Sequence, residues 1–493
     1  MYESSMPRPL LSHPWLRRPG LAATLLACGA IGLLAVWRLE CVRLGPDPDT
    51  DAYGHYIIAR QLLETPGNLS IHWVWLPGYH ALLALFVRAG ITLDGVRVFN
   101  TLLAAVPPLL LLWSLRTSDD AGNERELPAL AAVLAAGAPI AMSMGTTGQM
   151  EVSFSALVLG GTLLLARERT AAAAVVFSIA ALTRYEAWAA VAGIALALTI
   201  GAARARELPR PGYLACVVGP LLAVLAWAGA RWLQGEPWFG FLVDNQAFAE
   251  RALRQTQPGA RWLATALARY PFTMPALSFG VPAVFALLGI LRGARREGIW
   301  FVLIPLSMLV FLLSGALSRS HLGLDRHFLS LVPFFAVWIA HGIAHAAESL
   351  SRMSARLSSR TCFALLSLGA IGAQQVVLAG PWATWKETTR VALASERAAG
   401  RFVASLPGSA LVVCDEASVE VLSGIEAERC LRSRVRPELM PELLRRAETS
   451  DVFVVSRSER IESVTALGPV VYRSQSGTAL AVLHVEGPAL TAR

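Results

Sequence analysis

The sequence predicts a polytopic α-helical membrane protein that carries a small α/β domain at its C-terminal end. Of the 493 residues, 55% are hydrophobic and only 16% are charged, and the mean hydropathy is +0.51. A single soluble core does not require so much apolar surface. After about residue 381 charged residues become more frequent and apolar runs become shorter. We therefore expect a membrane region at residues 20–380 and a separate domain at residues 381–493.

Apolar segments recur along the first part of the chain, and most have roughly the 17–25 residues that a bilayer demands. They predict about eleven transmembrane helices, with the segment at 170–183 clearly short. The segments are 20–37, 98–114, 128–144, 150–166, 170–183, 187–203, 213–233, 273–291, 299–317, 327–347 and 361–380.

Arginine clusters predict the orientation of these helices. The formal charge of +8 comes mostly from Arg residues in short loops, without the aromatic interleaving of a nucleic-acid surface. The positive-inside rule places the clusters in the cytoplasm, together with residues 1–19. Counting from them places residues 45–95 and the whole C-terminal domain on the outer face of an inner membrane. The clusters are Arg8, Arg17 and Arg18; Arg204, Arg206 and Arg210; Arg292, Arg295 and Arg296; and Arg352, Arg356 and Arg360.

The first outer loop, residues 38–97, is expected to contain helices that do not cross the membrane. Pro77 begins a helix of about 13 residues, fewer than the roughly 17 needed to span, so we expect residues 76–89 to lie in the interface. A short spanning helix is the alternative. It would invert every later loop and break the Arg pattern.

Three aspartates near the start of this loop precede a helical run at residues 52–64. Asp49, Thr50 or Asp51 can cap that helix, where negative charge suits the helix dipole, and capping needs only one such residue. The alternative is catalysis, because Asp51 and His55 are four positions apart and share a helix face. A carboxylate held there can act as a general base.

The C-terminal domain is expected to be a small α/β fold. Residues 411–414, 452–455 and 479–483 have the continuous apolar character of buried strands, and residues 390–406 and 437–447 have helical patterns. Cys414 and Cys430 both fall in this domain, and the sequence leaves open whether they form a disulfide.

Several motifs of the membrane region, taken in order, resemble the GT-C membrane glycosyltransferases, in particular the aminoarabinose transferase and protein O-mannosyltransferase branch. The resemblance covers roughly residues 20–380, and its motifs are fairly specific only together. They are DAYGHYIIARQLLE at 51–64, WLPGYHALL at 75–83, GVRVFN at 95–100, ALTRYE at 181–186, and RHFL through Pro333 from residue 326.

The resemblance implies an enzyme that takes a sugar from a polyprenyl-phosphate carrier on the outer face and passes it to a lipid, glycan or protein acceptor. It places the catalytic aspartate at Asp51, where a base would remove the proton of the acceptor hydroxyl. A bidentate Arg suits the departing phosphate, and Arg326 is the first candidate, with His327 beside it.

Further candidates for substrate or phosphate binding lie on the same predicted side. Arg184 and Glu186 form a charged turn that is costly in a membrane unless it lines a cavity, although snorkelling to the interface explains Arg184 equally well. Glu151 orients the acceptor or a metal, or it caps its helix. His55 and His80 are candidate polar contacts.

Asp49 and Asp51 also resemble a metal-binding acidic pair, but two carboxylates are too few oxygen ligands to decide, so dependence on a divalent metal is open. The family has a basic and acidic cluster before its interfacial helix, whereas residues 71–75 read IHWVW, so the donor sugar is not assigned. Two rival functions also remain: a transporter or flippase of lipid-linked substrates, for which no internal repeat is visible, and a non-catalytic membrane subunit.

Overall fold

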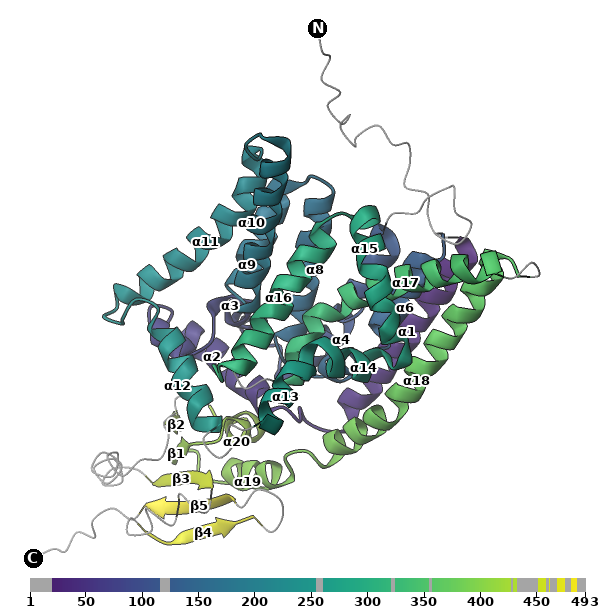
Figure 1. Cartoon of the computed structure of the whole chain (residues 1–493). Helices are drawn as coiled ribbons and strands as arrows, with labels where there is room; N and C mark the ends of the chain where they lie inside the picture. Colours follow the sequence, from purple (N-terminus) through teal and green to yellow (C-terminus); the bar gives the residue numbers. More distant parts are fainter. Residues whose placement is uncertain are drawn as a thin grey trace, which may run out of the picture.

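The computed structural model shows a helical bundle with a small sheet domain at one end (Figure 1). The structure describes the chain from residue 20 to residue 485, except for residues 116–124, 254–259, 321–323, 354–356, 427–428, 432–450, 458–460, 462–467 and 475–479. The predictions for residues 1–19, Arg356 and the helix at 437–447 lie outside the described residues.

Seven helical segments among the described residues are long and apolar enough to cross a membrane, and three shorter apolar helices accompany them. The chain is therefore a multi-pass membrane protein, although the expected count of eleven spans is not confirmed. The seven are Leu21–Leu44 (α1), Leu93–Ser114 (α4, Leu93–Leu103, and α5, Val106–Ser114), Glu186–Ala205 (α10), Pro211–Trp232 (α11), Trp300–Leu317 (α16), Asp325–Met353 (η5, Asp325–Leu331, and α17, Val332–Met353) and Ser359–Ala404 (α18, Ser359–Val391, and α19, Ala394–Ala404). The shorter helices are Leu127–Ala136 (α6), Glu151–Ala166 (α8) and Thr170–Ala181 (α9).

Two of the expected spans are broken where a glycine and a proline lie close together. In the segment 128–144, the chain leaves α6 at Gly137 and begins α7, Pro139–Met144, at a proline that fits the first turn of a helix. In the segment 273–291, Gly280 has a φ of +67°, which glycine adopts at low cost. This segment comprises η3 (Arg269–Thr273), α14 (Met274–Phe279), η4 (Val281–Val284) and α15 (Phe285–Glu297).

The segment formed by η5 and α17 is the centre of the bundle, because nearly all of it is buried inside the protein. Glycines permit its close packing against α15: a Cβ atom on Gly289 would lie 1.7 Å from the carbonyl oxygen of Trp338. A Cβ atom on Gly342 would likewise lie 1.9 Å from the carbonyl oxygen of Phe285. Larger residues at these two positions would force the helices apart. The residues that begin this segment are consequently fixed relative to the whole membrane region.

The first outer loop contains α2 (Thr50–Glu64), the short 3-10 helix η2 (Leu69–His72) and α3 (Pro77–Arg88). The 12 residues of α3 extend about 18 Å, less than the roughly 30 Å of a bilayer core. The side chain of Asp49 accepts a hydrogen bond from the amide of Asp51, so Asp49 is the N-cap of α2. The capping interpretation of this aspartate is therefore correct, and it leaves Asp51 in the first turn.

The C-terminal region is a five-stranded mixed sheet in the order β2-β1-β3-β5-β4. Strands β1 and β3 are parallel, with Val412 opposite Phe453, whereas β5 is antiparallel to both β3 and β4. Helices α19 and α20 pack on one face of the sheet. The strands are Leu411–Cys414 (β1), Cys430–Leu431 (β2), Val452–Arg457 (β3), Val470–Arg473 (β4) and Leu480–Val485 (β5), and α20 is Ala417–Ser423.

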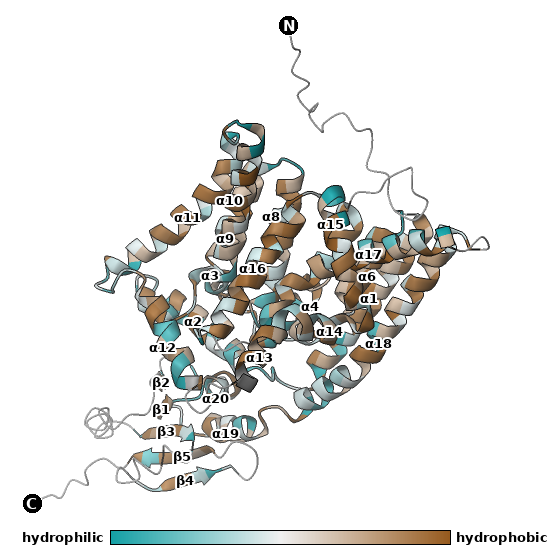
Figure 2. Cartoon of the chain, in the orientation of Figure 1, coloured by the Kyte–Doolittle hydropathy of each residue, from teal (hydrophilic) through white to brown (hydrophobic). Residues whose placement is uncertain are grey.

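The C-terminal region is continuous with the membrane region, since α18 extends through residue 381 as one helix and the domain boundary stays a prediction. Helix α20 packs against α2, where Arg60 Nη1 lies 3.5 Å from Glu420 Oε1. Figure 1 places the sheet, α2, α12 (Gly240–Leu253) and α13 (Ala260–Ala268) on one side of the molecule. The α10–α11 connection lies on the other side, and Figure 2 shows hydrophobic residues along the long helices between the two sides.

Candidate active site

A cluster of charged side chains lies where four separate segments meet. Seven of the nine residues that the sequence analysis selected belong to it, whereas His55 and His80 form a neighbouring cluster of their own. The start of α2 supplies Asp49 and Asp51, α8 supplies Glu151, the α9–α10 turn and the first residue of α10 supply Arg184 and Glu186, and η5 supplies Arg326 and His327.

Arg326 is the centre of this ionic cluster. Its Nη1 lies 2.7 Å from Asp49 Oδ2 and its Nη2 lies 2.5 Å from Asp51 Oδ2. Its Nε lies 3.2 Å from Glu151 Oε1. One planar guanidinium therefore faces three carboxylates, which is the geometry in which Arg outperforms Lys.

A second arginine extends the cluster into the protein. Arg184 Nη1 lies 2.5 Å from Glu151 Oε1, and its Nη2 lies 2.8 Å from Glu186 Oε1. His327 Nδ1 lies 2.9 Å from the same oxygen of Glu186. Glu151 thus joins the two arginines, and Arg184 is buried in an ion-pair network instead of snorkelling to an interface.

The exposed fractions of the side chains show which side of the ionic cluster is accessible to solvent. The side chain of Asp51 is 39% exposed, Arg326 is 16% exposed and Glu151 is 2% exposed. A substrate that enters from solvent therefore meets Asp51 and Arg326 before it meets Glu151. Burial raises the pKa of Asp49, and the Arg326 guanidinium opposes that shift.

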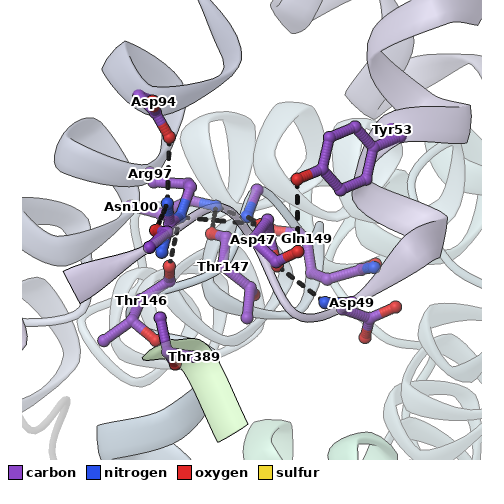
Figure 3. A network of polar contacts seen from close by, with 12 residues as sticks. Asp47, Asp49, Tyr53, Asp94, Arg97, Asn100, Thr146, Thr147, Gln149 and Thr389 are labelled. Atoms are coloured by element: carbon purple, nitrogen blue, oxygen red, sulfur yellow. Dashed lines mark hydrogen bonds and ion pairs between the residues drawn. The ribbon is translucent and has the colours of Figure 1, made fainter. Parts of the chain in front are cut away.

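The loop that carries Asp49 is fixed by a second polar network, shown in Figure 3. Asp47 is fully buried, and its carboxylate accepts hydrogen bonds from the amides of Asp49 and Gly148. Burial raises the pKa of Asp47 to about 7, while Arg97, whose Nε lies 3.9 Å away, opposes the rise. This network connects the start of α2 with the segment before α8, and it therefore sets the position of Asp51 relative to Glu151.

Asn100 fixes the same segment from the other side. Its Nδ2 donates to the carbonyl oxygens of Thr147 and Gln149, at 2.8 and 2.9 Å. Arg97 donates from Nε to the carbonyl oxygen of Thr146 and from Nη1 to that of Gly45. Two side chains of α4 thus satisfy backbone groups that would otherwise be unpaired inside the protein.

Sequence reasoning missed Gln149, which lies two positions before Glu151. Its side chain is fully buried, and neither Nε2 nor Oε1 has a hydrogen-bond partner among the described residues. In Figure 3 its amide points toward the side where Asp49 and Tyr53 lie. A buried amide without partners is costly, so this position is suited to a polar ligand. No sequence signal distinguishes it, because a lone Gln in a loop has no characteristic spacing.

His55 and His80 are brought together by a third imidazole, that of His72. His55 Nδ1 lies 2.9 Å from His80 Nε2, and His80 Nδ1 lies 2.7 Å from His72 Nδ1. All three rings are buried. No pattern in the sequence distinguishes His72, because the turn that ends η2 decides where its ring points. Trp73, the next residue, has a φ of +48°, and its carbonyl oxygen accepts a hydrogen bond from Arg231.

Among the described residues, no group of three or more His, Cys, Asp or Glu side chains is arranged to hold a metal ion. Asp49, Asp51 and Glu151 face Arg326 instead, so the guanidinium already neutralises part of their charge. The acidic pair that resembles a metal site in the sequence is therefore an arginine-binding pair in this structure.

Comparison with known proteins gives a fold and no sequence family: no family model and no curated protein matches the chain. The solved structure of ArnT from Cupriavidus metallidurans, bound to undecaprenyl phosphate, matches with a TM-score of 0.57 at 12% identity. The match covers 94% of this chain and 98% of that chain. The chain has the fold of ArnT. The resemblance to GT-C aminoarabinose transferases is thereby confirmed at the level of the fold.

Proposed function

We propose that the chain is an integral membrane glycosyltransferase of the GT-C type. It transfers a sugar from a polyprenyl-phosphate-linked donor to a lipid, glycan or protein acceptor on the outer face of the membrane, with Asp51 as the general base. The observation that carries this proposal is the contact of Arg326 with Asp51 at the accessible side of the ionic cluster. The ArnT fold supports the class of enzyme and the class of donor.

The donor phosphate is bound by Arg326. This residue begins the central segment of the bundle, so the bundle fixes its position while its side chain stays partly exposed. A phosphate presents the same pair of acceptor oxygens as a carboxylate and carries more charge, so it competes with Asp49 and Asp51 for the two Nη groups. Donor binding then releases the carboxylate of Asp51 from its ion pair.

The released carboxylate of Asp51 accepts the proton of the acceptor hydroxyl while that oxygen attacks the anomeric carbon of the donor sugar. The bond from the anomeric carbon to the phosphate oxygen breaks, and its electron pair leaves with the carrier phosphate on Arg326. The configuration at the anomeric carbon is inverted because attack and departure occur on opposite faces. A positioned base of this kind contributes on the order of 10²–10⁴-fold.

Charge balance defines the role of Asp49. Four carboxylates of the ionic cluster face two guanidiniums, so an incoming phosphate adds negative charge to a site that already has an excess. Asp49 has a pKa raised by burial, and it is therefore the carboxylate that takes up a proton when the phosphate binds. Gln149 contributes a neutral donor and acceptor to a hydroxyl of the sugar or the acceptor.

The outer face is assigned from the arginine clusters. Arg204, Arg206 and Arg210 adjoin the α10–α11 connection, which lies opposite the side that carries α2 and the sheet (Figure 1). The positive-inside rule makes the α10–α11 side cytoplasmic. The ionic cluster and the C-terminal domain then face the extracytoplasmic side of the inner membrane.

Transfer activity tests the proposal directly. Membranes that contain the wild-type chain are incubated with radiolabelled polyprenyl-phosphate sugars, and incorporation into acceptors is compared with Asp51→Asn at matched expression. Asp244→Asn, at an exposed position of α12 on the same side, is the matched control for the lost charge. We expect transfer by the wild type and the control and a loss of at least about 100-fold for Asp51→Asn. Equal transfer by all three removes Asp51 from catalysis, and movement of labelled lipid without transfer favours a flippase.

A further inference from the structure

Three half-buried aromatic side chains, which we call the aromatic wall, lie outside the ionic cluster. Trp73 and Trp75 belong to the segment between η2 and α3, and Phe248 belongs to α12. The rings of Trp73 and Trp75 have their centroids 6.1 Å apart at an interplanar angle of 86°. The rings of Trp73 and Phe248 have theirs 5.3 Å apart at 77°. The three rings therefore form one continuous aromatic surface.

Trp75 lies directly against the helix that carries Asp51. Gly54 follows Asp51 by three positions on α2, and a Cβ atom on Gly54 would lie 3.3 Å from Cη2 of Trp75. The ring of His55, four positions after Asp51, has its centroid 4.5 Å from that of Trp75. Residues three and four positions apart share a helix face, with about 5–6 Å between their Cβ atoms. Trp75 and Asp51 therefore adjoin the same face of α2, one turn apart.

The charges that act on His55 confirm that this face adjoins the ionic cluster. Burial lowers the pKa of His55 to about 4, the carboxylates of Asp51 and Glu151 oppose the shift, and the two arginines of the cluster add to it. The imidazole that supports the ring of Trp75 is therefore within electrostatic reach of both carboxylates and both guanidiniums.

The backbone around Trp75 is fixed by side chains from other elements. Arg231 Nη1 donates to the carbonyl oxygen of Trp73 at 2.8 Å, and the hydroxyl of Tyr185 donates to that of Val74 at 2.5 Å. Trp73 has a φ of +48°, a conformation that is costly for a residue with a bulky side chain. Such conformations persist where the surroundings impose them, and they are frequent at ligand-binding sites. The rings are consequently held in place before a ligand binds.

Trp75 retains groups that the described part of the chain does not use. Its side chain is half-buried, and among the described residues its indole Nε1 has no hydrogen-bond partner and no cationic side chain lies over its ring. The negative face of an indole attracts the weakly positive C–H groups of a sugar ring, and its N–H donates to a hydroxyl. An isoprenoid chain would cover the ring but offer the N–H no acceptor. A sugar ring matches both groups.

We propose that the aromatic wall is the subsite for the donor sugar, with Trp75 stacked on the pyranose ring and its Nε1 donating to a hydroxyl of that ring. The proposal rests on the function proposed above, because it needs the donor phosphate on Arg326 and the acceptor at Asp51. With these groups placed, the sugar ring lies beside α2 one turn after Asp51, where Trp75 stands.

The charge of the ionic cluster restricts the sugar further. Its four carboxylates face two guanidiniums, and the donor phosphate adds negative charge. A sugar that carries a carboxylate would add still more negative charge at the same place, and like charges in close contact exclude a ligand. The subsite therefore takes a pyranose without a carboxylate, such as a neutral hexose.

Binding in detergent solution tests the subsite without relying on transfer. The affinity of the full chain is measured for undecaprenyl phosphate alone and for the same lipid carrying glucose, galactose, mannose or glucuronic acid. We expect at least one hexose lipid to bind about tenfold more tightly than the bare phosphate, and the glucuronic acid lipid to gain nothing. Trp75→Ala is expected to remove the advantage of the hexose lipid and to keep the affinity for the bare phosphate.

Two further substitutions separate stacking from packing. Trp75→Phe retains an aromatic face, whereas Trp75→Leu fills space without one. We expect Trp75→Phe to keep most of the preference for the hexose lipid and Trp75→Leu to lose it, and this comparison decides if Trp75→Ala does not fold. Trp232→Ala is the matched control, since Trp232 is 50% exposed and stacks on Trp238 instead of on the wall. It is expected to show the wild-type preference.

The outcomes distinguish the subsite from the function on which it rests. A wild type without preference for any hexose lipid, or a preference that survives in Trp75→Leu, overturns the subsite. An equal loss of affinity for the hexose lipid and the bare phosphate also overturns it, because Trp75 then supports the fold or the phosphate. Tighter binding of the glucuronic acid lipid overturns the choice of sugar. Absence of transfer by a wild type that prefers the hexose lipid refutes the proposed function and leaves the subsite standing.

Discussion

Arg326 and Asp51 lie 275 positions apart in the chain and form an ion pair at the accessible side of the ionic cluster. Arg326 begins the most buried segment of the bundle, whereas Asp51 lies in the first turn of a short outer helix. The pair therefore connects the rigid centre of the protein with its outer loop. It also keeps the proposed base occupied until a phosphate competes for the guanidinium.

The first prediction concerns Arg326→Lys. A lysine retains the charge but replaces the planar fork with a single ammonium, so it cannot contact both oxygens of a phosphate as Arg does. Loss of one charge-assisted hydrogen bond, worth about 1.5–3 kcal/mol, raises the KM for the donor by about 10–100-fold. Steady-state transfer kinetics measure this change.

The control for that change is Arg269→Lys. Arg269 pairs with Asp325, the residue before Arg326, and its side chain is 34% exposed, so the substitution alters a nearby ion pair outside the cluster. We expect its donor KM to match that of the wild type. An unchanged donor KM in Arg326→Lys would show that the phosphate binds elsewhere.

The second prediction concerns Asp47 and pH. Its pKa in the folded chain is about 7, above the ordinary value of 3.8, so the folded state binds more protons than the unfolded state between these values. The stability that protonated Asp47 contributes is therefore complete below about pH 4 and is lost as the pH rises through 7. The loss is at most about 1.4 kcal/mol per pH unit.

Thermal unfolding in detergent, measured from pH 5 to pH 8, tests this dependence. The Tm difference between the wild type and Asp47→Asn should shrink or reverse in sign as the pH rises. Asp94→Asn, which removes the exposed partner of Arg97, is expected to show no such trend. A Tm difference that grows with pH would mean that Arg97 and the two amide donors keep Asp47 ionised in the folded chain.

Most of the fold could be predicted because it depends on the length of each apolar run and on the spacing of apolar residues within it. Both can be read from neighbouring positions in the sequence. The strands at 411–414 and 452–455 and the helix that begins near Pro77 were found from such patterns. The breaks inside 128–144 and 273–291 were missed. Each break occurs where a glycine and a proline lie close together. A mean hydropathy taken over a whole span changes little when only two of its residues break the helix.

The residues of the candidate site that could be predicted are those that place a charge within an apolar region, where a charge is energetically costly. Arg184 and Glu186 stand out because they interrupt apolar segments, and the structure joins them to Glu151 and Arg326. Gln149 and His72 do not stand out, since each is positioned by partners distant in the sequence. Asn100 fixes the backbone of Gln149, and Arg231 fixes the turn that follows His72.

The third prediction concerns orientation. Cysteine is introduced at Leu208, 92% exposed between α10 and α11, and at Ser409, exposed before β1. A membrane-impermeant maleimide applied to intact spheroplasts is expected to label Ser409→Cys and to reach Leu208→Cys only after lysis. Five native cysteines are buried and Cys28 lies within α1, so the unmodified chain serves as the control. The reverse pattern would place the ionic cluster in the cytoplasm.

The last prediction separates binding from structure at Gln149. Both polar atoms of its side chain lack partners among the described residues, so Gln149→Leu removes a buried amide that stabilises nothing in the unliganded chain. We expect its thermal stability to equal or exceed that of the wild type, because replacing an unsatisfied polar group with an apolar one of similar size relieves a desolvation cost. Transfer is expected to fall by at least about tenfold, as a ligand hydroxyl then loses its partner.

Asn100→Leu supplies the contrast, since Asn100 Nδ2 donates to the carbonyl oxygens of Thr147 and Gln149. Its loss leaves buried carbonyl groups unpaired and is expected to cost about 1–3 kcal/mol of stability. A gain or neutrality in stability together with lost transfer is the signature of a residue selected for a ligand instead of for the fold. If Gln149→Leu is destabilised as strongly as Asn100→Leu, the amide has a structural partner such as a bound water, and Gln149 is no longer a ligand contact.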